Sequence, residues 1–212
     1  MRLKKNIFFT LFPVGYWIVI AVGIVFNFLS DVSQLGNVLI NLGTFLVAYK
    51  VAVIIHETGH LIAAKSVGGT PRRVVLGKGH ELYRTKIRNI RVVINSNFLG
   101  GHAYASFEQP GLLKLRYGAF ILGGVLLNLI CGLVMSIFFE VDFTNSRGEV
   151  IIAIPFTIFL ANSLMVLNLI PYNTTIMGMK VSTDGLALLK LPFTKPGEIE
   201  KRIDVNLLFD GH

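Results

Sequence analysis

The stretch VAVIIHETGH, residues 51–60, ends a long apolar run with two histidines and a glutamate. On an α-helix, positions i and i+4 lie on one face, so His56 and His60 can present two imidazoles to one zinc ion. Glu57 lies beside them and can take a proton from a metal-bound water, whose pKa zinc lowers to about 7. Ionisable side chains at this membrane depth are energetically expensive and usually functional, which favours a zinc hydrolase over solvated surface residues.

The composition around this stretch is that of an integral membrane protein. Hydrophobic residues make up 53% and charged residues 15% of the 212 residues, against about 25% charged residues in soluble domains. This composition excludes a disordered chain, a coiled coil and collagen. The single cysteine, Cys131, excludes an intrachain disulfide and CxxC metal or redox motifs.

The apolar runs predict an all-α polytopic membrane protein with four transmembrane helices. We expect the chain to form a single membrane-embedded domain over residues 1–212. A small cytoplasmic β-hairpin or sheet, at about residues 72–108, is expected between the second and third spans, because short β-prone runs alternate there with glycine and polar residues. A cytoplasmic tail is expected over residues 186–212. The predicted spans are residues 7–29, 36–64, 115–139 and 150–171.

The charge pattern predicts the orientation of these spans. The net charge is +8, and the basic residues gather before the first span, between the second and third, and after the fourth. By the positive-inside rule, both termini and the 66–114 connection are cytoplasmic. This distribution fits a lipid bilayer rather than nucleic acid as the partner, and the compact chain suggests a bacterial cytoplasmic membrane.

Two histidines and a glutamate base require a third protein ligand for zinc. His80, His102 and His212 are candidates, as are the acidic residues. Asp184 follows the predicted fourth span and returns to the membrane side of His56 and His60. It, or a neighbouring Ser182 or Thr183, can equally well cap a short helix at residues 186–191. The topology alone supports the two interpretations evenly.

Three motifs in order resemble the site-2 protease family of intramembrane zinc metalloproteases. The first is HETGH at 56–60. The second, Gly124-Val125-Leu126-Leu127-Asn128, resembles the family's Gly-Pro-x-x-Asn motif except that Val125 replaces proline. The third, Asn168-Leu169-Ile170-Pro171 followed by Asp184-Gly185, resembles its Asn-Leu-Leu-Pro and distal Asp-Gly motifs, with a longer connection between them. The resemblance covers the second to fourth predicted spans.

The resemblance implies a role for each motif. Glu57 becomes the catalytic base, and Asn128 and Asn168 support the substrate or a developing oxyanion. One zinc ion per chain is implied, and its ligands are His56, His60 and Asp184.

The resulting hypothesis is a membrane zinc endopeptidase that acts on membrane-spanning or membrane-associated proteins or peptides. The alternatives are a non-enzymatic membrane protein, such as an immunity or scaffold factor that retains a zinc site, and a metal transporter. Glu57 argues against a pure metal-binding role, and a transporter would show polar residues along a path. Lys50 within the second run is interpreted either as a snorkelling or cavity-facing lysine or as a residue that lines the active-site cavity. The sequence leaves the oligomeric state open.

Overall fold

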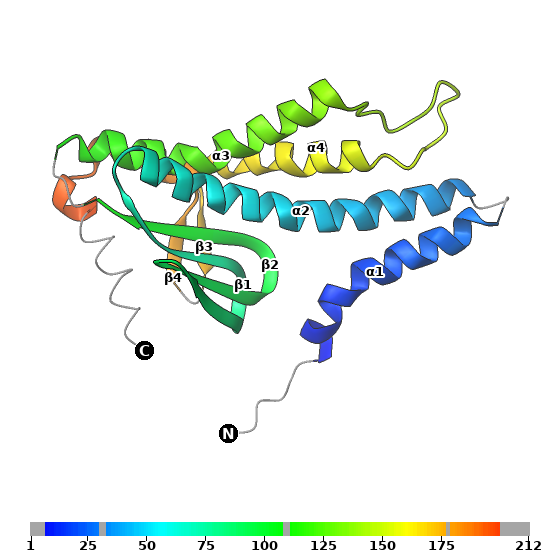
Figure 1. The fold of residues 1–212 in the computed structure, drawn as a ribbon, viewed down its shortest axis with the longest axis horizontal. Helices are drawn as coiled ribbons and strands as arrows, with labels where there is room; N and C mark the ends of the chain where they lie inside the picture. The colour runs from blue at the N-terminus through cyan, green and yellow to red at the C-terminus, as the bar shows by residue number, and fades with distance from the viewer. Residues whose placement is uncertain (1–6, 30–32, 108–110, 177–178, 200–212) are drawn as a thin grey trace. The chain divides into compact units, whose positions relative to one another are not determined.

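The computed structural model describes residues 7–29, 33–107, 111–176 and 179–199, with the side chains of 7–14 and 174–181 outside that description. Figure 1 shows the chain as helices interrupted by a long β-hairpin after α2. Contacts between Cα atoms group the chain into two compact units. The first contains residues 1–52 and 129–164, and the second contains residues 53–128 and 165–212.

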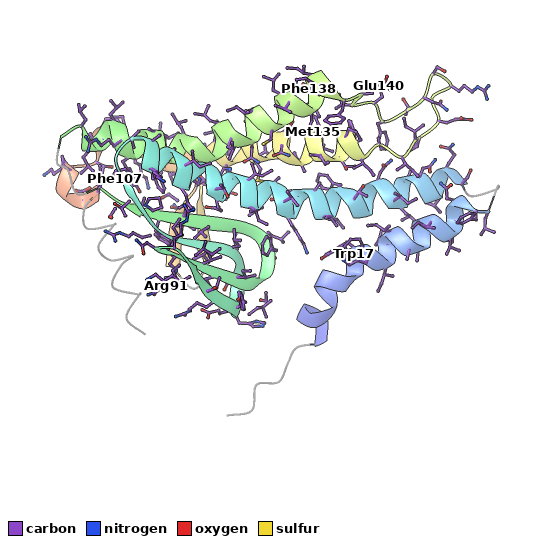
Figure 2. The ribbon with its side chains drawn as sticks, in the orientation of Figure 1. Trp17, Arg91, Phe107, Met135, Phe138 and Glu140 are labelled. Carbon is purple, nitrogen blue, oxygen red and sulfur yellow. The ribbon has the colours of Figure 1, made fainter. Side chains whose placement is uncertain are left out.

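Among the described residues, two helices are long and apolar enough to cross a membrane: α2 (Ser33–Ser66) and α3 (Leu113–Phe138). They correspond to the predicted second and third spans. Their exposed side chains are largely apolar, as for Phe138 at the last turn of α3 (Figure 2). Such exposure suits a helix that contacts lipid rather than water.

The prediction of four transmembrane helices is wrong, and the fourth span shows why. Residues 150–153 are extended, and the helix α4 begins only at Ile154 and ends at Leu164. The chain then tightens into the 3₁₀ helix η2 (Met165–Leu169) before Pro171. The 11 residues of α4 rise about 16 Å, well short of the roughly 30 Å hydrocarbon core.

Side-chain amides on α2 hold the start of this segment in its extended form. The Asn41 amide donates to the carbonyl of Ile151 at 2.6 Å, and its oxygen accepts from the N–H of Ala153 at 2.8 Å. Asn37 donates to the carbonyl of Val150 at 2.8 Å. These bonds satisfy backbone groups that would otherwise need partners within a helix, so residues 150–153 do not have to be helical. The length of an uncharged run therefore overestimates the length of the helix.

The predicted first span contains the helix α1. The helix α1 runs over Ile7–Asn27, but the part whose side chains are described, Gly15–Asn27, is a shorter apolar helix. Also in the first unit, the Lys50 ammonium lies 4.1 Å from the centre of the Tyr16 ring. This cation–π contact gives the charge of α2 an aromatic partner.

The β-hairpin between the second and third predicted spans is confirmed. It consists of the antiparallel strands β1 (Thr70–Ile87) and β2 (Ile90–Ser106). Val75 of β1 is paired with both His102 and Val93, so the first half of β1 lies between the two halves of β2. The fold is therefore not all-α.

A second, unpredicted hairpin joins Pro171 to Asp184. Its strands are β3 (Asn173–Ile176) and β4 (Met179–Ser182). The pairing of Asn173 with Ser182 brings the two ends of this connection together. The short helix expected next is present as α5 (Asp184–Lys190), followed by the 3₁₀ helix η3 (Leu191–Phe193).

The core of the second unit lies where α2, β2, α3 and α5 meet. Ala64, Ala103 and Phe120 are at its centre, and Phe107 joins it at the end of β2 (Figure 2). Small residues on α2 and β2 allow the helices and the hairpin to approach closely. The same packing fixes the C-terminal half of α2, which carries the histidines.

Candidate metal centre

The three residues of the histidine motif lie on α2 and are buried. The exposed fractions are 4% for His56, 4% for Glu57 and 5% for His60. The two imidazole rings are perpendicular, at 89°, with their centres 4.8 Å apart. The i, i+4 spacing thus turns both rings to one side of the helix, as predicted.

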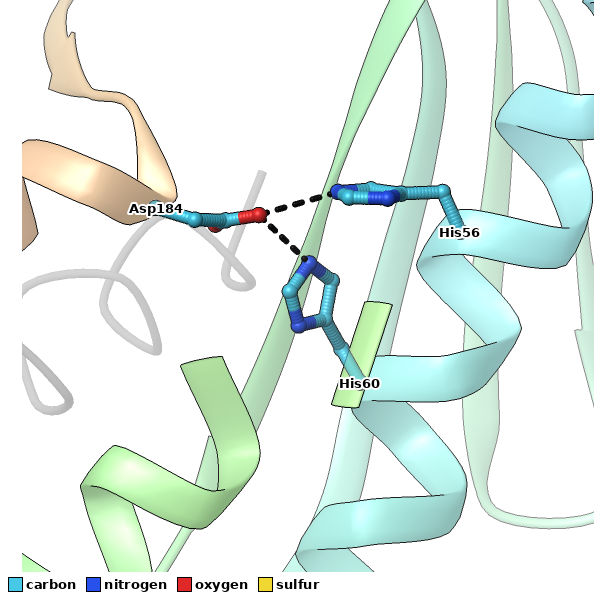
Figure 3. A group of neighbouring side chains, drawn as sticks. All are labelled: His56, His60 and Asp184. Atoms are coloured by element: carbon cyan, nitrogen blue, oxygen red, sulfur yellow. Dashed lines mark hydrogen bonds and ion pairs between the residues drawn. The ribbon is translucent and has the colours of Figure 1, made fainter. Parts of the chain in front are cut away.

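Asp184, the first residue of α5, meets the two histidines (Figure 3). Its Oδ2 atom lies 3.0 Å from Nε2 of His56 and 3.5 Å from Nε2 of His60. The ligand atoms of the three residues all lie within 4.8 Å of one another. Residues separated by more than 120 positions in the chain therefore form one cluster.

The β3–β4 hairpin and its flanking residues position Asp184. The Thr183 hydroxyl donates to the carbonyl of Ile170 at 2.8 Å, and the N–H of Thr183 donates to the carbonyl of Tyr172 at 3.0 Å. Thr183 occupies the N-cap position of α5 without a side-chain capping bond. Gly185 lies against the backbone of Leu169, where a side chain would not fit. The carboxylate of Asp184 is thus directed to the histidines rather than to the helix end.

Hydrogen bonds to the other ring nitrogens determine the tautomers of both histidines. Nδ1 of His60 lies 2.8 Å from the carbonyl oxygen of Phe120, which can only accept, so Nδ1 carries the proton. Nδ1 of His56 lies 3.0 Å from Oδ1 of Asn128, which requires the same arrangement. In the neutral rings, each Nε2 then presents its lone pair toward Asp184, and this second layer of hydrogen bonds is typical of histidine metal ligands.

The cluster fits a zinc ion. Two imidazole lone pairs and a carboxylate oxygen converge, and three electron-pair donors at this distance require a cation or shared protons between them. Ligand atoms bound at about 2.0–2.1 Å around a tetrahedral zinc ion lie about 3.3 Å apart. The observed 3.0 and 3.5 Å separations from Asp184 bracket that value.

A comparison with protein-family models agrees with this chemistry. The model of Peptidase family M50 matches residues 44–145. Residues 44–145 belong to Peptidase family M50. This is the site-2 protease family, so the resemblance drawn from the motifs is confirmed. No curated protein matches the chain.

The M50 stretch contains His56, Glu57, His60 and Asn128, whereas Asn168 and Asp184 lie beyond it. M50 peptidases are membrane metalloproteases, which accords with the two candidate spans and the metal cluster. The assignment of Asp184 as a candidate third ligand is therefore supported by geometry rather than by the family match.

Two glycines leave space for the reactive groups of the M50 stretch. A Cβ atom on Gly124 of α3 would lie 2.5 Å from Nε2 of His60 and 2.9 Å from Cε1 of His56. A Cβ atom on Gly101 of β2 would lie 2.7 Å from Oε1 of Glu57. The helix α3 therefore lies against the imidazoles, and β2 lies against the carboxylate.

The electrostatics of the cluster favour an ionised Asp184. Burial alone would raise the pKa of its carboxyl group, but when the imidazoles are protonated on both nitrogens, the charge of His60 and hydrogen bonds from both histidines outweigh burial and hold the pKa well below its usual range. The Asp184 carboxylate is therefore an anionic candidate ligand at neutral pH.

The alternative third ligands do not join the cluster within the described part of the chain. His102 lies on β2 with its ring beside Tyr104, and burial lowers the pKa of His102 to about 4. His80 lies exposed on β1. His212 falls outside the described residues.

The structure brings both predicted asparagines to the site. Asn128 is fully buried and accepts a hydrogen bond from His56. The Asn168 amide nitrogen lies 3.5 Å from Nε2 of His56. Sequence reasoning missed the Phe120 carbonyl, which nothing in the sequence marks, and the contact of Gly101 with Glu57. The Gly100-Gly101 pair was the available signal, since adjacent glycines in a strand often mark a close approach.

Proposed function

We propose that the chain is an intramembrane zinc metalloprotease that hydrolyses peptide bonds of membrane-spanning or membrane-associated proteins or peptides. The observation that carries the proposal is the convergence of His56, His60 and Asp184 beside Glu57. The family match over residues 44–145 and the two candidate spans support it. We also propose the orientation predicted from the basic residues, with both termini in the cytoplasm.

His56, His60 and Asp184 would hold one zinc ion. When bound, zinc supplies Lewis-acid chemistry that activates water and polarises the scissile carbonyl group. The chain contributes the orientation of its ligands. The Phe120 carbonyl and the Asn128 amide hold the two imidazoles in the tautomer that leaves Nε2 unprotonated.

Glu57 acts as the general base. Its Oε2 atom is buried and has no hydrogen-bond partner among the described residues. A carboxylate oxygen in this state is poised to accept a proton from an attacking water and then deliver it to the leaving amine. Gly101 lies close against the Glu57 side chain, where a larger residue would displace the carboxylate.

The two asparagines take different roles in this proposal. Because Oδ1 of Asn128 accepts from His56, we assign Asn128 to positioning that ring. The Asn168 amide lies closest to the unprotonated nitrogen of His56, where it can donate to a substrate carbonyl oxygen as negative charge develops. This donor lies on η2, just before Pro171.

The second half of β2 offers a place for the substrate. Residues 101–106 pair with β1 on one side, and the described strands provide no partner on the other. An extended substrate backbone added at this edge would pass Gly101 and therefore Glu57. Strand addition also exposes the peptide bond that a helical substrate would keep within its own hydrogen bonds.

The test compares wild-type protein with Glu57→Gln and Asp184→Ala. Cleavage of fluorescein-labelled casein in detergent and zinc content by elemental analysis are measured on the same samples. We expect Glu57→Gln to retain zinc but lose cleavage, and Asp184→Ala to lose both. Glu149→Gln, at an exposed acid of the α3–α4 connection, is the matched control and should behave as wild type.

If the wild-type protein binds zinc but does not cleave casein, the protease proposal fails and a metal-binding membrane protein remains as the interpretation. Cleavage at the wild-type rate by Glu57→Gln would exclude the proposed base.

A further inference from the structure

The far end of the β1–β2 hairpin, residues 82–91, exposes apolar side chains. Leu82, Tyr83 and Ile87 are 56%, 58% and 59% exposed. These residues lie in the hairpin and not in a candidate membrane span. A cluster of large apolar side chains at one exposed end of a ribbon marks an interaction surface rather than a random surface pattern.

The same end is strongly basic. Residues 82–91 contain four lysines and arginines and no acidic residue, and Glu81 directly precedes them. Glu81 is engaged by Arg84 through two hydrogen bonds, the shorter of 2.7 Å. Lys86, Arg88 and Arg91 follow within a few residues, and Arg91 is labelled on the hairpin in Figure 2. The partner of this surface should therefore carry negative charge.

The register separates the apolar and basic residues onto two faces of the ribbon. Tyr83 pairs with Ile94, Thr85 with Val92, and Ile87 with Ile90. On the other face, Lys86 pairs with Arg91 and Arg84 with Val93. Directly paired residues in an antiparallel ladder share a face, and successive residues alternate. One face is therefore mainly apolar, and the other carries cationic side chains.

We infer that residues 82–91 bind the surface of a bilayer that contains anionic phospholipids. A two-faced element with apolar and cationic sides lies at the boundary between headgroups and acyl chains. The connections are short: β1 begins four residues after α2 ends, and α3 begins seven residues after β2 ends. The hairpin is thus tethered to the ends of the two candidate spans, and anionic headgroups provide the counter-charge for Lys86 and Arg88.

The test places a fluorescent probe at the tip of the full-length protein. The native cysteine is removed by Cys131→Ala, and Asn89→Cys in the exposed turn is labelled with an environment-sensitive fluorophore. The protein is reconstituted in phosphatidylcholine alone or with phosphatidylglycerol at about three to one, since anionic lipids attract basic segments. Acrylamide, a neutral quencher, reports exposure of the probe to water. A second labelled protein, Ser146→Cys, carries the probe on the exposed α3–α4 connection as the control.

We expect phosphatidylglycerol to protect the Asn89→Cys probe from acrylamide and to leave the Ser146→Cys probe unchanged. Combining Lys86→Gln with Arg88→Gln should weaken this lipid dependence by about fivefold for each charge removed. Tyr83→Ser with Ile87→Ser should reduce protection in both lipid mixtures. Unchanged zinc content in each variant would show that the fold of the metal centre is retained.

Equal quenching in the two lipid mixtures would overturn the inference, as would equal protection at Ser146→Cys. An undiminished lipid dependence after the loss of both charges would likewise overturn it. The readout does not require peptide hydrolysis, so its outcome is independent of the proposed protease activity.

Discussion

A single methyl group on α3 should abolish metal binding. In Gly124→Ala, the new Cβ would lie 2.5 Å from Nε2 of His60 and 2.7 Å from its Cε1. Restoring an ordinary contact of at least 3.4 Å moves the ring by about 0.9 Å, whereas zinc sites tolerate about 0.2 Å in ligand distances. The Phe120 carbonyl holds the ring from the opposite nitrogen, so relaxation also strains that hydrogen bond.

The matched control is Gly132→Ala on the same helix. Its Cβ would find its nearest neighbour at 3.8 Å, an ordinary van der Waals distance. Both substitutions gain about 0.5–1 kcal/mol of helix propensity, so any difference between them comes from the space beside the imidazoles. We expect zinc per chain, measured by elemental analysis, to fall sharply in Gly124→Ala and to stay at the wild-type level in Gly132→Ala. Wild-type zinc content in a folded Gly124→Ala protein would refute the assignment of these imidazoles as ligands.

Three further predictions follow from individual contacts. Gly101→Ala should keep zinc but lower casein cleavage by about 10²-fold, because its Cβ displaces the Glu57 carboxylate; Gly100→Ala, with 3.6 Å of space, should cleave normally. Asn128→Leu should weaken zinc affinity by about 10–100-fold in a chelator competition, whereas Asn128→Asp, which keeps an acceptor for His56, should retain most of it. Asn41→Leu should destabilise the protein by about 1–3 kcal/mol for each backbone group left unpaired, seen as a lower Tm with zinc content unchanged.

The candidate metal-binding pair was predictable because its arrangement depends on local geometry alone. The spacing of His56 and His60 fixes their common face on any helix, and the structure retains that geometry. The third ligand depends on long-range folding. From the sequence, Asp184 was equally suited to binding a metal and to capping a helix. In the structure, Thr183 takes the cap position of α5. The strands β3 and β4 bring the two ends of the connection together, so that Asp184 reaches the histidines.

Helix length was the part of the fold that the sequence could not supply. Hydropathy reports which residues avoid water, but it does not report where backbone groups find other partners. The extended residues 150–153 are apolar, yet their hydrogen bonds go to the amides of Asn37 and Asn41, more than a hundred positions away. The β1–β2 hairpin was easier to predict, because its β-branched runs and glycines act locally.

The requirement that buried polar atoms be hydrogen-bonded explains the amides on α2. It also singles out Glu57 beside the candidate metal centre. In apolar surroundings, each buried polar atom needs a partner, and Asn41, Asn128 and the two histidines all have one. Within the described residues, Oε2 of Glu57 departs from this requirement, as several buried atoms elsewhere do, but it is the one that lies beside the metal cluster. A carboxylate oxygen is too costly to bury without a compensating interaction, so its partner must come from outside the described residues. The water consumed in peptide hydrolysis is a partner of the required kind, since it donates a proton at the atom left unpaired.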